Sequence, residues 1–155
     1  MERVLVSACL LGAAVRYDGR AKTSHSAILA RWRTEGRVVP FCPELAGGLG
    51  VPRPPAEIRD GSVVTSTGDD VTEAFRRGAE LALETALRAE VKVAVLKEGS
   101  PSCGLHQIAD GTFTGHKIPG SGITTTLLQA HNIKVFTENE LDKADLCLTT
   151  TPPAP

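Results

Sequence analysis

Three of the four cysteines in this sequence each follow a short apolar run. Cys9 comes directly after VLVSA, Cys42 comes directly after RVVPF, and Cys103 lies a few residues beyond VKVAVL in the stretch LKEGSPSCG. Structural cysteines are usually buried and inert, whereas reactive or ligating cysteines lie in partly accessible loops. Thiolates are soft ligands that select zinc, copper(I) or iron–sulfur clusters. These cysteines therefore indicate a metal or cluster site, provided that the fold brings them together.

The apolar runs alternate with helical patterns, which predicts an α/β domain. We expect a single-domain, three-layer Rossmann-like fold with a mainly parallel sheet, spanning residues 1–148, and a disordered tail over 149–155. The expected strands cover residues 4–8, 37–41, 91–96 and 133–136, with a short edge strand over 62–66. The expected helices cover 24–35 with Ser24 as N-cap, 70–90, a segment from Ser121 or Thr124 to His131, and a short terminal helix from Glu138.

Such a fold makes the cysteine pattern a geometric prediction. Parallel strands end at one edge of the sheet, and ligands bind in the crevice outside that edge. Cys9, Cys42 and Cys103 should therefore face one crevice, although each could instead be a small core residue. Three protein ligands leave one coordination position open, which is typical of a catalytic site. We interpret Cys147, which follows the terminal helix, as a bystander.

Other polar residues accompany the cysteines in the same loops. Glu44 follows Cys42 by two positions in CPE and can serve as a general acid or base. Ser100 and Ser102 precede Cys103 in SPSC, and Ser102 is interpreted as a turn residue. The four histidines show no spacing typical of metal ligands. The candidate site is therefore built from cysteines and one glutamate, with the SPSC serines beside them.

The composition excludes several classes of partner. Seventeen basic and 18 acidic residues give a formal charge of −1, so the chain has no net field that would attract nucleic acid or anionic lipid. Aromatic residues make up 4% of the chain, too few for base-stacking platforms. The apolar N-terminal run is too short to span a bilayer, and we interpret it as the first strand.

Widely spaced cysteines without a CxxC pair fit reduced thiols in the cytoplasm. The sequence indicates no oligomeric state.

The motifs in combination resemble a bacterial family of small domains, the 2-thiouracil desulfurases. The resemblance rests on ACLLG with RYDG, FCPELAGGLGVPRPP, LKEGSPSCG, and DGTFTG followed by GSGIT, and it extends from Val4 to Leu141. It implies a [4Fe–4S] cluster held by Cys9, Cys42 and Cys103, with one iron left open to bind the substrate sulfur. It also implies catalytic roles for Glu44 and Ser100.

The implied reaction is a non-redox cleavage of a carbon–sulfur bond. A thiolated pyrimidine such as 2-thiouracil would be converted to the oxo base and hydrogen sulfide, with Glu44 moving protons and Ser100 hydrogen bonding to the substrate. The expected partner is thus a small thiolated base, and neither a nucleic acid polymer nor a membrane. The resemblance leaves the natural substrate open among free thiobases, thionucleosides and other thioamides.

Two other readings compete with this one. A cysteine-nucleophile hydrolase of the phosphatase type would need the pattern C-x5-R, and Arg16 falls one residue too late after Cys9. A non-catalytic protein that binds zinc or an iron–sulfur cluster would use the same three cysteines without turnover. Phosphatase activity that survives metal removal but is lost in Cys9→Ser would favour the hydrolase. A loaded protein that releases no sulfide from any thiolated base would favour binding alone.

Overall fold

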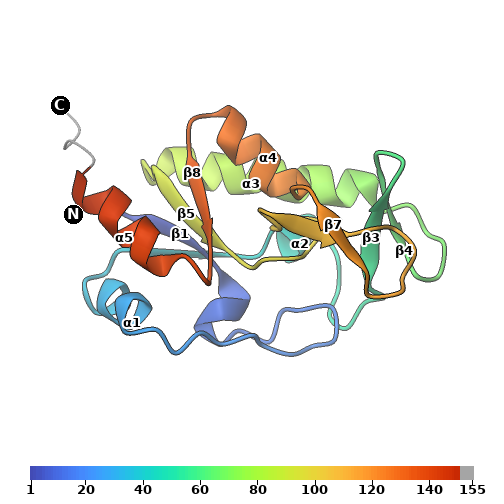
Figure 1. Ribbon diagram of the computed structural model, residues 1–155, viewed down its shortest axis with the longest axis horizontal. Coiled ribbons are helices and arrows are strands. Elements are labelled where there is room, and N and C mark those ends of the chain that lie inside the picture. The colour runs from blue at the N-terminus through green and yellow to red at the C-terminus, as the bar shows by residue number, and fades with distance from the viewer. Residues whose placement is uncertain (151–155) are drawn as a thin grey trace.

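The computed structural model describes residues 1–150 and contains a four-stranded parallel sheet (Figure 1). The strand order is β2–β1–β5–β8, and every neighbouring pair is parallel. β1 and β5 are buried along their whole length, as expected for Val-rich central strands covered on both faces. The predicted mainly parallel sheet is confirmed. Its strands are β1 (Val4–Ser7), β2 (Val38–Phe41), β5 (Val93–Leu96) and β8 (Lys134–Thr137).

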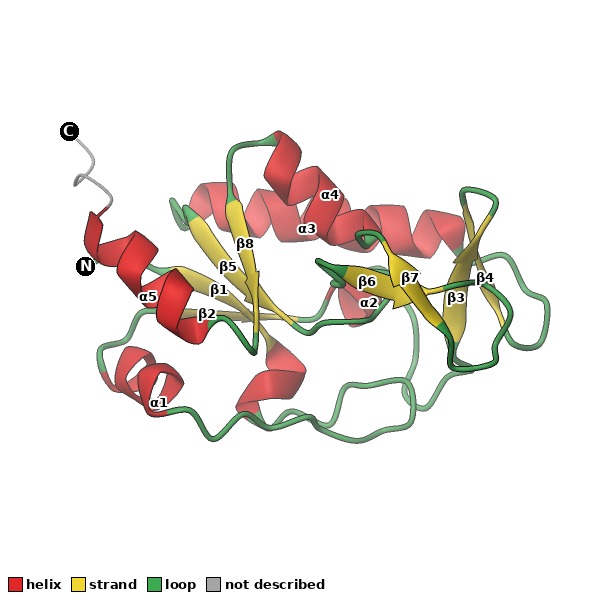
Figure 2. Ribbon diagram, in the orientation of Figure 1, coloured by secondary structure: helices red, strands yellow, loops and turns green. Residues whose placement is uncertain are grey.

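Helices cover both faces of this sheet and complete the three predicted layers (Figure 2). Alternate strand residues feed two separate cores: Val4 packs with Trp32 on one face, and Leu5 packs with Leu128 on the other. α1 (Ala27–Thr34) and α5 (Leu141–Thr150) lie on the first face, and α3 (Thr72–Arg88) and α4 (Ile123–Ala130) lie on the second. Within residues 1–150, no helix is both long and apolar enough to cross a membrane.

Two antiparallel hairpins extend beyond one end of the sheet (Figure 1). Glu57 joins them, because its Oε1 accepts the backbone N–H groups of Gly111 and Phe113 at 2.9 and 3.1 Å. The expected edge strand over 62–66 forms, but it pairs in a separate sheet with a strand that the sequence analysis did not predict. The hairpins are β3 (Ala56–Arg59) with β4 (Ser62–Thr65), and β6 (Gln107–Ala109) with β7 (Lys117–Pro119).

The helix ends differ from the predicted ones for local reasons. Ser26, not Ser24, is the N-cap of α1, because the Ser26 hydroxyl accepts the Ile28 N–H at 3.1 Å. α4 follows Gly122 rather than beginning at Ser121 or Thr124. α5 runs to Thr150, two residues past the expected domain boundary, and residues 151–155 of the expected tail lie outside the described residues.

The strand order creates a crevice next to β1. From β1 the chain passes to β2 on one side, whereas β5 and β8 lie on the other side. Where successive connections diverge in this way, the carboxyl ends of the strands leave room for a ligand. A short 3-10 helix, η1 (Ala8–Leu11), follows β1 directly and carries Cys9 at this point.

Candidate functional site

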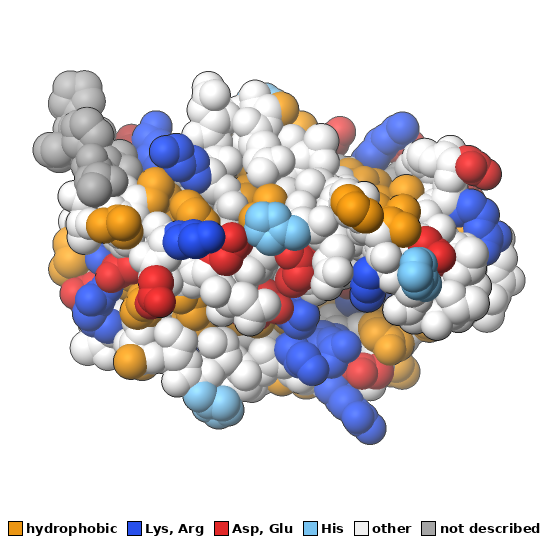
Figure 3. Space-filling view, in the orientation of Figure 1, with side chains coloured by type: hydrophobic (Ala, Val, Ile, Leu, Met, Phe, Trp, Pro, Cys, Tyr) orange, Lys and Arg blue, Asp and Glu red, His pale blue; other side chains and the backbone are white. Residues whose placement is uncertain are grey.

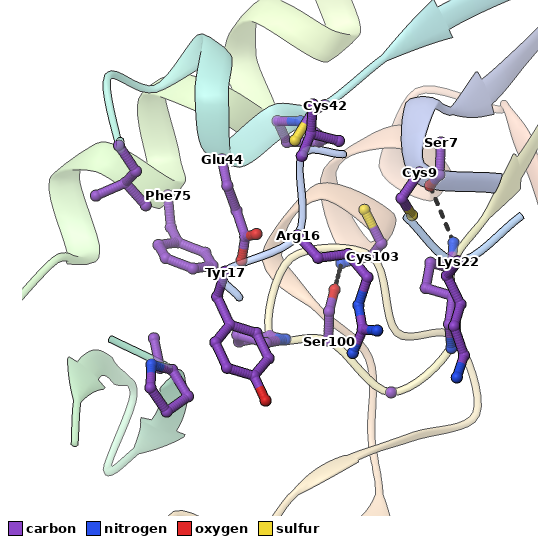
Figure 4. A pocket seen from close by; sticks show the side chains of 18 of the residues that line it. Ser7, Cys9, Arg16, Tyr17, Lys22, Cys42, Glu44, Phe75, Ser100 and Cys103 are labelled. Atoms are coloured by element: carbon purple, nitrogen blue, oxygen red, sulfur yellow. Dashed lines mark hydrogen bonds between the residues drawn. The ribbon is translucent and has the colours of Figure 1, made fainter. Parts of the chain in front are cut away.

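A pocket of about 700 Å³ opens at the carboxyl edge of the sheet, facing the two hairpins. All five residues that the sequence analysis selected for chemistry line it: Cys9, Cys42, Glu44, Ser100 and Cys103. Figure 4 shows the three sulfur atoms around one part of the pocket, with the Glu44 carboxylate and the Ser100 hydroxyl nearby. Cys147 lies within α5 rather than after the terminal helix, does not line the pocket and packs against the core on that face of the sheet.

Cys42 and Glu44 are positioned by a close contact between two helices. Cys42 precedes α2 (Pro43–Ala46), a short helix in a segment predicted as loop. A Cβ atom at Gly47 would lie 2.0 Å from the Ala74 carbonyl oxygen, and one at Gly78 would lie 2.0 Å from the Pro43 carbonyl oxygen. Only glycines at these positions let α2 rest directly on α3, which fixes the direction of the Glu44 side chain.

The loop that carries Cys103 is held by its own serines and by α4. Ser100 Oγ accepts the Cys103 N–H at 2.7 Å, and the buried Ser102 hydroxyl lies 2.7 Å from that of Thr124. The Thr125 hydroxyl donates to the Cys103 carbonyl oxygen at 2.9 Å. The expected turn role of Ser102 is therefore accompanied by a buried contact to α4 that the sequence did not indicate.

The Glu98 side chain holds the same loop through hydrogen bonds to its backbone. Its carboxylate accepts backbone N–H groups from Gly99, Leu105 and His106 at 2.8 to 3.3 Å. Burial by itself raises the pKa of Glu98, but these donors outweigh it, so that the pKa of this carboxyl lies below its ordinary value. One carboxylate thus ties together both ends of the loop that presents Cys103.

The three thiols lie in an environment that disfavours their ionisation. Burial raises the pKa of Cys9 to about 11 and that of Cys103 to about 12, and it also raises the pKa of Cys42. Lys97 partly opposes this effect at Cys9, and Arg53 opposes it at Cys42. A cysteine nucleophile needs a lowered pKa, so this environment argues against the hydrolase reading.

Arg53 forms an ion pair with Glu44. The sequence analysis did not select this arginine. Its guanidinium pairs with Glu44 Oε2 and donates to the carbonyl oxygens of Val15 and Gly50 at 3.0 and 2.9 Å. The side chain of Arg53 is 8% exposed and that of Glu44 is 20% exposed. Within residues 1–150, the structure records no other hydrogen bond to the Glu44 carboxylate. One of its oxygens is therefore available to a molecule in the pocket.

A solved structure with high sequence identity has the same fold. A "[4Fe-4S]-dependent thiouracil desulfidase TudS" superimposes with a TM-score of 0.96 at 51% identity, covering 97% of this chain and all of that one. An uncharacterised protein of Bacillus subtilis, YbbK, is 42% identical over 149 residues, which is 90% of this chain and 97% of the relative. Each similarity spans nine tenths or more of this chain.

The match to a family model covers the same region. The model of the 2-thiouracil desulfurases aligns with residues 4–140, from β1 to the residue before α5. The segments around Cys9, Cys42 and Cys103 all lie inside this match. The chain therefore belongs to the 2-thiouracil desulfurase family.

Proposed function

We propose that this protein removes sulfur from a thiolated pyrimidine such as 2-thiouracil, using a [4Fe–4S] cluster held by Cys9, Cys42 and Cys103. The thiocarbonyl and one water molecule become a carbonyl and hydrogen sulfide, so the reaction needs no oxidant or reductant. The observation that carries the proposal is the pocket itself, which joins three thiols, a glutamate and a serine in a member of this enzyme family.

The three thiols fit a cluster chemically. None of them forms a disulfide, and all three face one pocket. Within residues 1–150, no three His, Cys, Asp or Glu side chains converge closely enough to hold a single metal ion. The three cysteines line one pocket, and soft thiolates are the ligands that an iron–sulfur cluster takes. Bound iron would also stabilise the thiolates, whose formation burial opposes.

When bound, the cluster would supply an iron with an open coordination position that acts as a Lewis acid toward the substrate sulfur. Glu44 is the proposed general base. Its available oxygen can take a proton from the water molecule that attacks the thiocarbonyl carbon, and it can return that proton to the departing sulfur. Arg53 holds the other oxygen, so the carboxylate stays aimed into the pocket.

Ser100 is the proposed hydrogen-bond donor to the substrate. Its oxygen already accepts the Cys103 N–H, which leaves the hydroxyl hydrogen to point toward the pocket. The same bond couples the serine to a proposed cluster ligand, so the substrate and the cluster are positioned by one turn. A serine three positions before Cys103 can therefore accept the Cys103 N–H and donate to the substrate with the same hydroxyl.

The walls of the pocket suit a flat heterocycle. Tyr17, Phe41 and Phe75 line it, and in the view of Figure 4 Glu44 and the rings of Tyr17 and Phe75 lie on the side away from Cys9. Lys and Arg side chains gather below the centre of the face in Figure 3, with acidic side chains above and beside them. The formal net charge of −1 supports a small-molecule substrate over a nucleic acid polymer. A reducing cytoplasm would preserve the thiols and the cluster, and we place the protein there.

Anaerobic reconstitution with iron and sulfide, followed by incubation with 2-thiouracil, tests the proposal. We expect about four irons per chain, from the proposed cluster stoichiometry, together with uracil and sulfide in equal amounts. Cys9→Ser, Cys42→Ser and Cys103→Ser should each lose the cluster, whereas the matched control Cys147→Ser should keep it. A wild-type protein that binds no iron would refute the proposal. One that binds a cluster tightly but releases no sulfide from thiolated pyrimidines would favour the non-catalytic reading.

A further inference from the structure

A second ion pair, Lys97 with Glu138, lines the same pocket as Arg53 and Glu44. Lys97 follows β5 and Glu138 follows β8, the neighbouring strand, so both lie at the edge of the sheet where Cys9 lies. Lys97 Nζ is 3.0 Å from Glu138 Oε1, and the two side chains are 23% and 18% exposed. Both line the pocket, and the proposed function assigns neither of them a role.

The hydrogen bonds of this pair direct the ammonium, not the carboxylate, toward the pocket. Glu138 Oε2 accepts the backbone N–H of Glu98 at 2.8 Å, so both carboxylate oxygens are already engaged. Lys97 Nζ also donates to the Glu98 carbonyl oxygen at 2.9 Å. An ammonium has three N–H groups, and in the described part of the chain the third has no recorded partner. The glutamate therefore acts as the support and the lysine as the exposed charge.

Lys97 is also tied to the cysteine ligands. Its backbone N–H donates to Ser7 Oγ at 3.0 Å, as the dashed line at Ser7 in Figure 4 shows. Ser7 is the last residue of β1 and lies two positions before Cys9. Lys97 and Cys9 follow the paired neighbouring strands β5 and β1 and line the same pocket. The positive charge of Lys97 thus lies on the thiol side of the pocket.

We infer that Lys97 is a charge-compensating residue for the cysteine-bound cluster and for the sulfur that leaves the substrate, and that Glu138 is its positioning residue. This inference rests on the proposed function. Three thiolates and a departing hydrosulfide collect negative charge at one end of the pocket. An ammonium that is already held in place stabilises this charge without reorganisation during the reaction.

The midpoint potential of the reconstituted cluster measures the local charge directly, because potentials depend on the net charge around a cluster. Lys97→Met removes a positive charge and should lower the potential, whereas Glu138→Gln removes a negative charge and should raise it. The double variant should return close to the wild-type value, and Lys97→Arg should stay near it. A merely structural disturbance would move both single variants in the same direction, which would overturn the inference.

Lys143→Met is the matched control, because Lys143 pairs with Glu140 from the same turn but its side chain is 74% exposed. We expect no change in potential for this variant. If wild-type protein forms a cluster but Lys97→Met and Lys143→Met have equal potentials, the inference fails while the proposed function stands. If wild-type protein forms no cluster, the proposed function itself fails. If Lys97→Met does not load, the sign of the Glu138→Gln shift decides.

Steady-state kinetics give a second readout. Charge that develops on sulfur as the carbon–sulfur bond breaks is stabilised mainly in the transition state, so Lys97→Met should lower kcat on the order of 10²-fold. The KM for 2-thiouracil should change much less, because the neutral substrate carries no charge for the ammonium to bind. A variant that changes KM alone would assign Lys97 to substrate binding and would overturn charge compensation.

Discussion

The two ion pairs beside the thiols present opposite charges to the pocket. In the first pair Glu44 faces the pocket and Arg53 supports it through the carbonyl oxygens of Val15 and Gly50. In the second pair Lys97 faces the pocket and Glu138 supports it. The first arrangement suits a group that accepts a proton, and the second suits a fixed positive charge. The difference matches a reaction in which water loses a proton at one place and sulfur gains negative charge at another.

In each pair, the supporting residue is the one whose hydrogen-bonding groups are paired with other parts of the protein. Buried charges are stable only when they are paired and hydrogen bonded. Arg53 and Glu138 use their donors or acceptors within the protein, which lets Glu44 and Lys97 keep an atom for the pocket. Both pairs thus join one acidic and one basic side chain, but the acidic one faces the pocket in the first pair and the basic one faces it in the second.

The largest effect is expected for Glu44→Gln, which removes the exposed member of the first pair as a base. Turnover of 2-thiouracil should fall on the order of 10²- to 10⁴-fold, the range typical of general base catalysis. Cluster content, measured by iron counting, should remain at the wild-type level. Glu138→Gln should lose less turnover, because Glu138 is a support. Equal losses in the two variants would remove the distinction between the pairs.

Arg53→Met should have the largest effect on stability. It leaves Glu44 without its cation and two carbonyl oxygens without a donor, and loss of one partner of a buried pair costs about 3 kcal/mol. Lys97→Met should cost about 1 kcal/mol, because Lys97 has fewer buried partners. Urea unfolding of the cluster-free variants measures both values. If Lys97→Met proved the more destabilising, Lys97 would be the structural member of its pair.

Glu98 should make the loop that carries Cys103 sensitive to acid. Its pKa is lowered in the folded protein from the ordinary value of 4.5, so its contribution to stability is present above about that pH. The contribution is lost as pH falls through the folded pKa. The difference in unfolding free energy between wild type and Glu98→Gln should therefore shrink between pH 7 and acidic pH. A constant difference would show that hydrogen bonding by the ionised carboxylate is not what holds the Cys103 loop.

The smallest effect is expected for an ion pair far from the pocket. Glu84 and Arg88 face solvent on α3, with side chains 49% and 79% exposed. Such pairs contribute little, so Arg88→Ala should change the unfolding free energy by less than about 0.5 kcal/mol. The urea midpoint measures this baseline. A larger change would mean that the contribution of an ion pair to the unfolding free energy does not depend on its burial. The exposed pair could then not serve as a baseline for the two pocket pairs.

Local sequence patterns predicted the parallel sheet, because short Val-rich runs such as VLVS and VAVL are typical of strands that are buried on both faces of such a sheet. β4 was predicted as an edge strand, but β3 and the β3–β4 hairpin were missed, although the hairpin turn carries a sequence signal. Asp60 and Gly61 both have positive φ values, 51° and 79°, as in the tight hairpin turn that Asp-Gly favours. The four-residue helix α2 was also missed, because its Gly- and Pro-rich sequence is typical of a loop and its conformation depends on contact with α3.

The sequence by itself determined that three cysteines follow strands, and with the family motifs it named Cys9, Cys42, Cys103, Glu44 and Ser100. Strand ends and short motifs are local properties, so a linear chain reveals them. Only the tertiary structure decided how these side chains are supported. Arg53 meets the Val15 carbonyl across 38 positions, and Lys97 meets Glu138 across 41. Such partners are selected by packing and by the cost of burying an unpaired charge, and neither is visible in the spacing of residues along the chain.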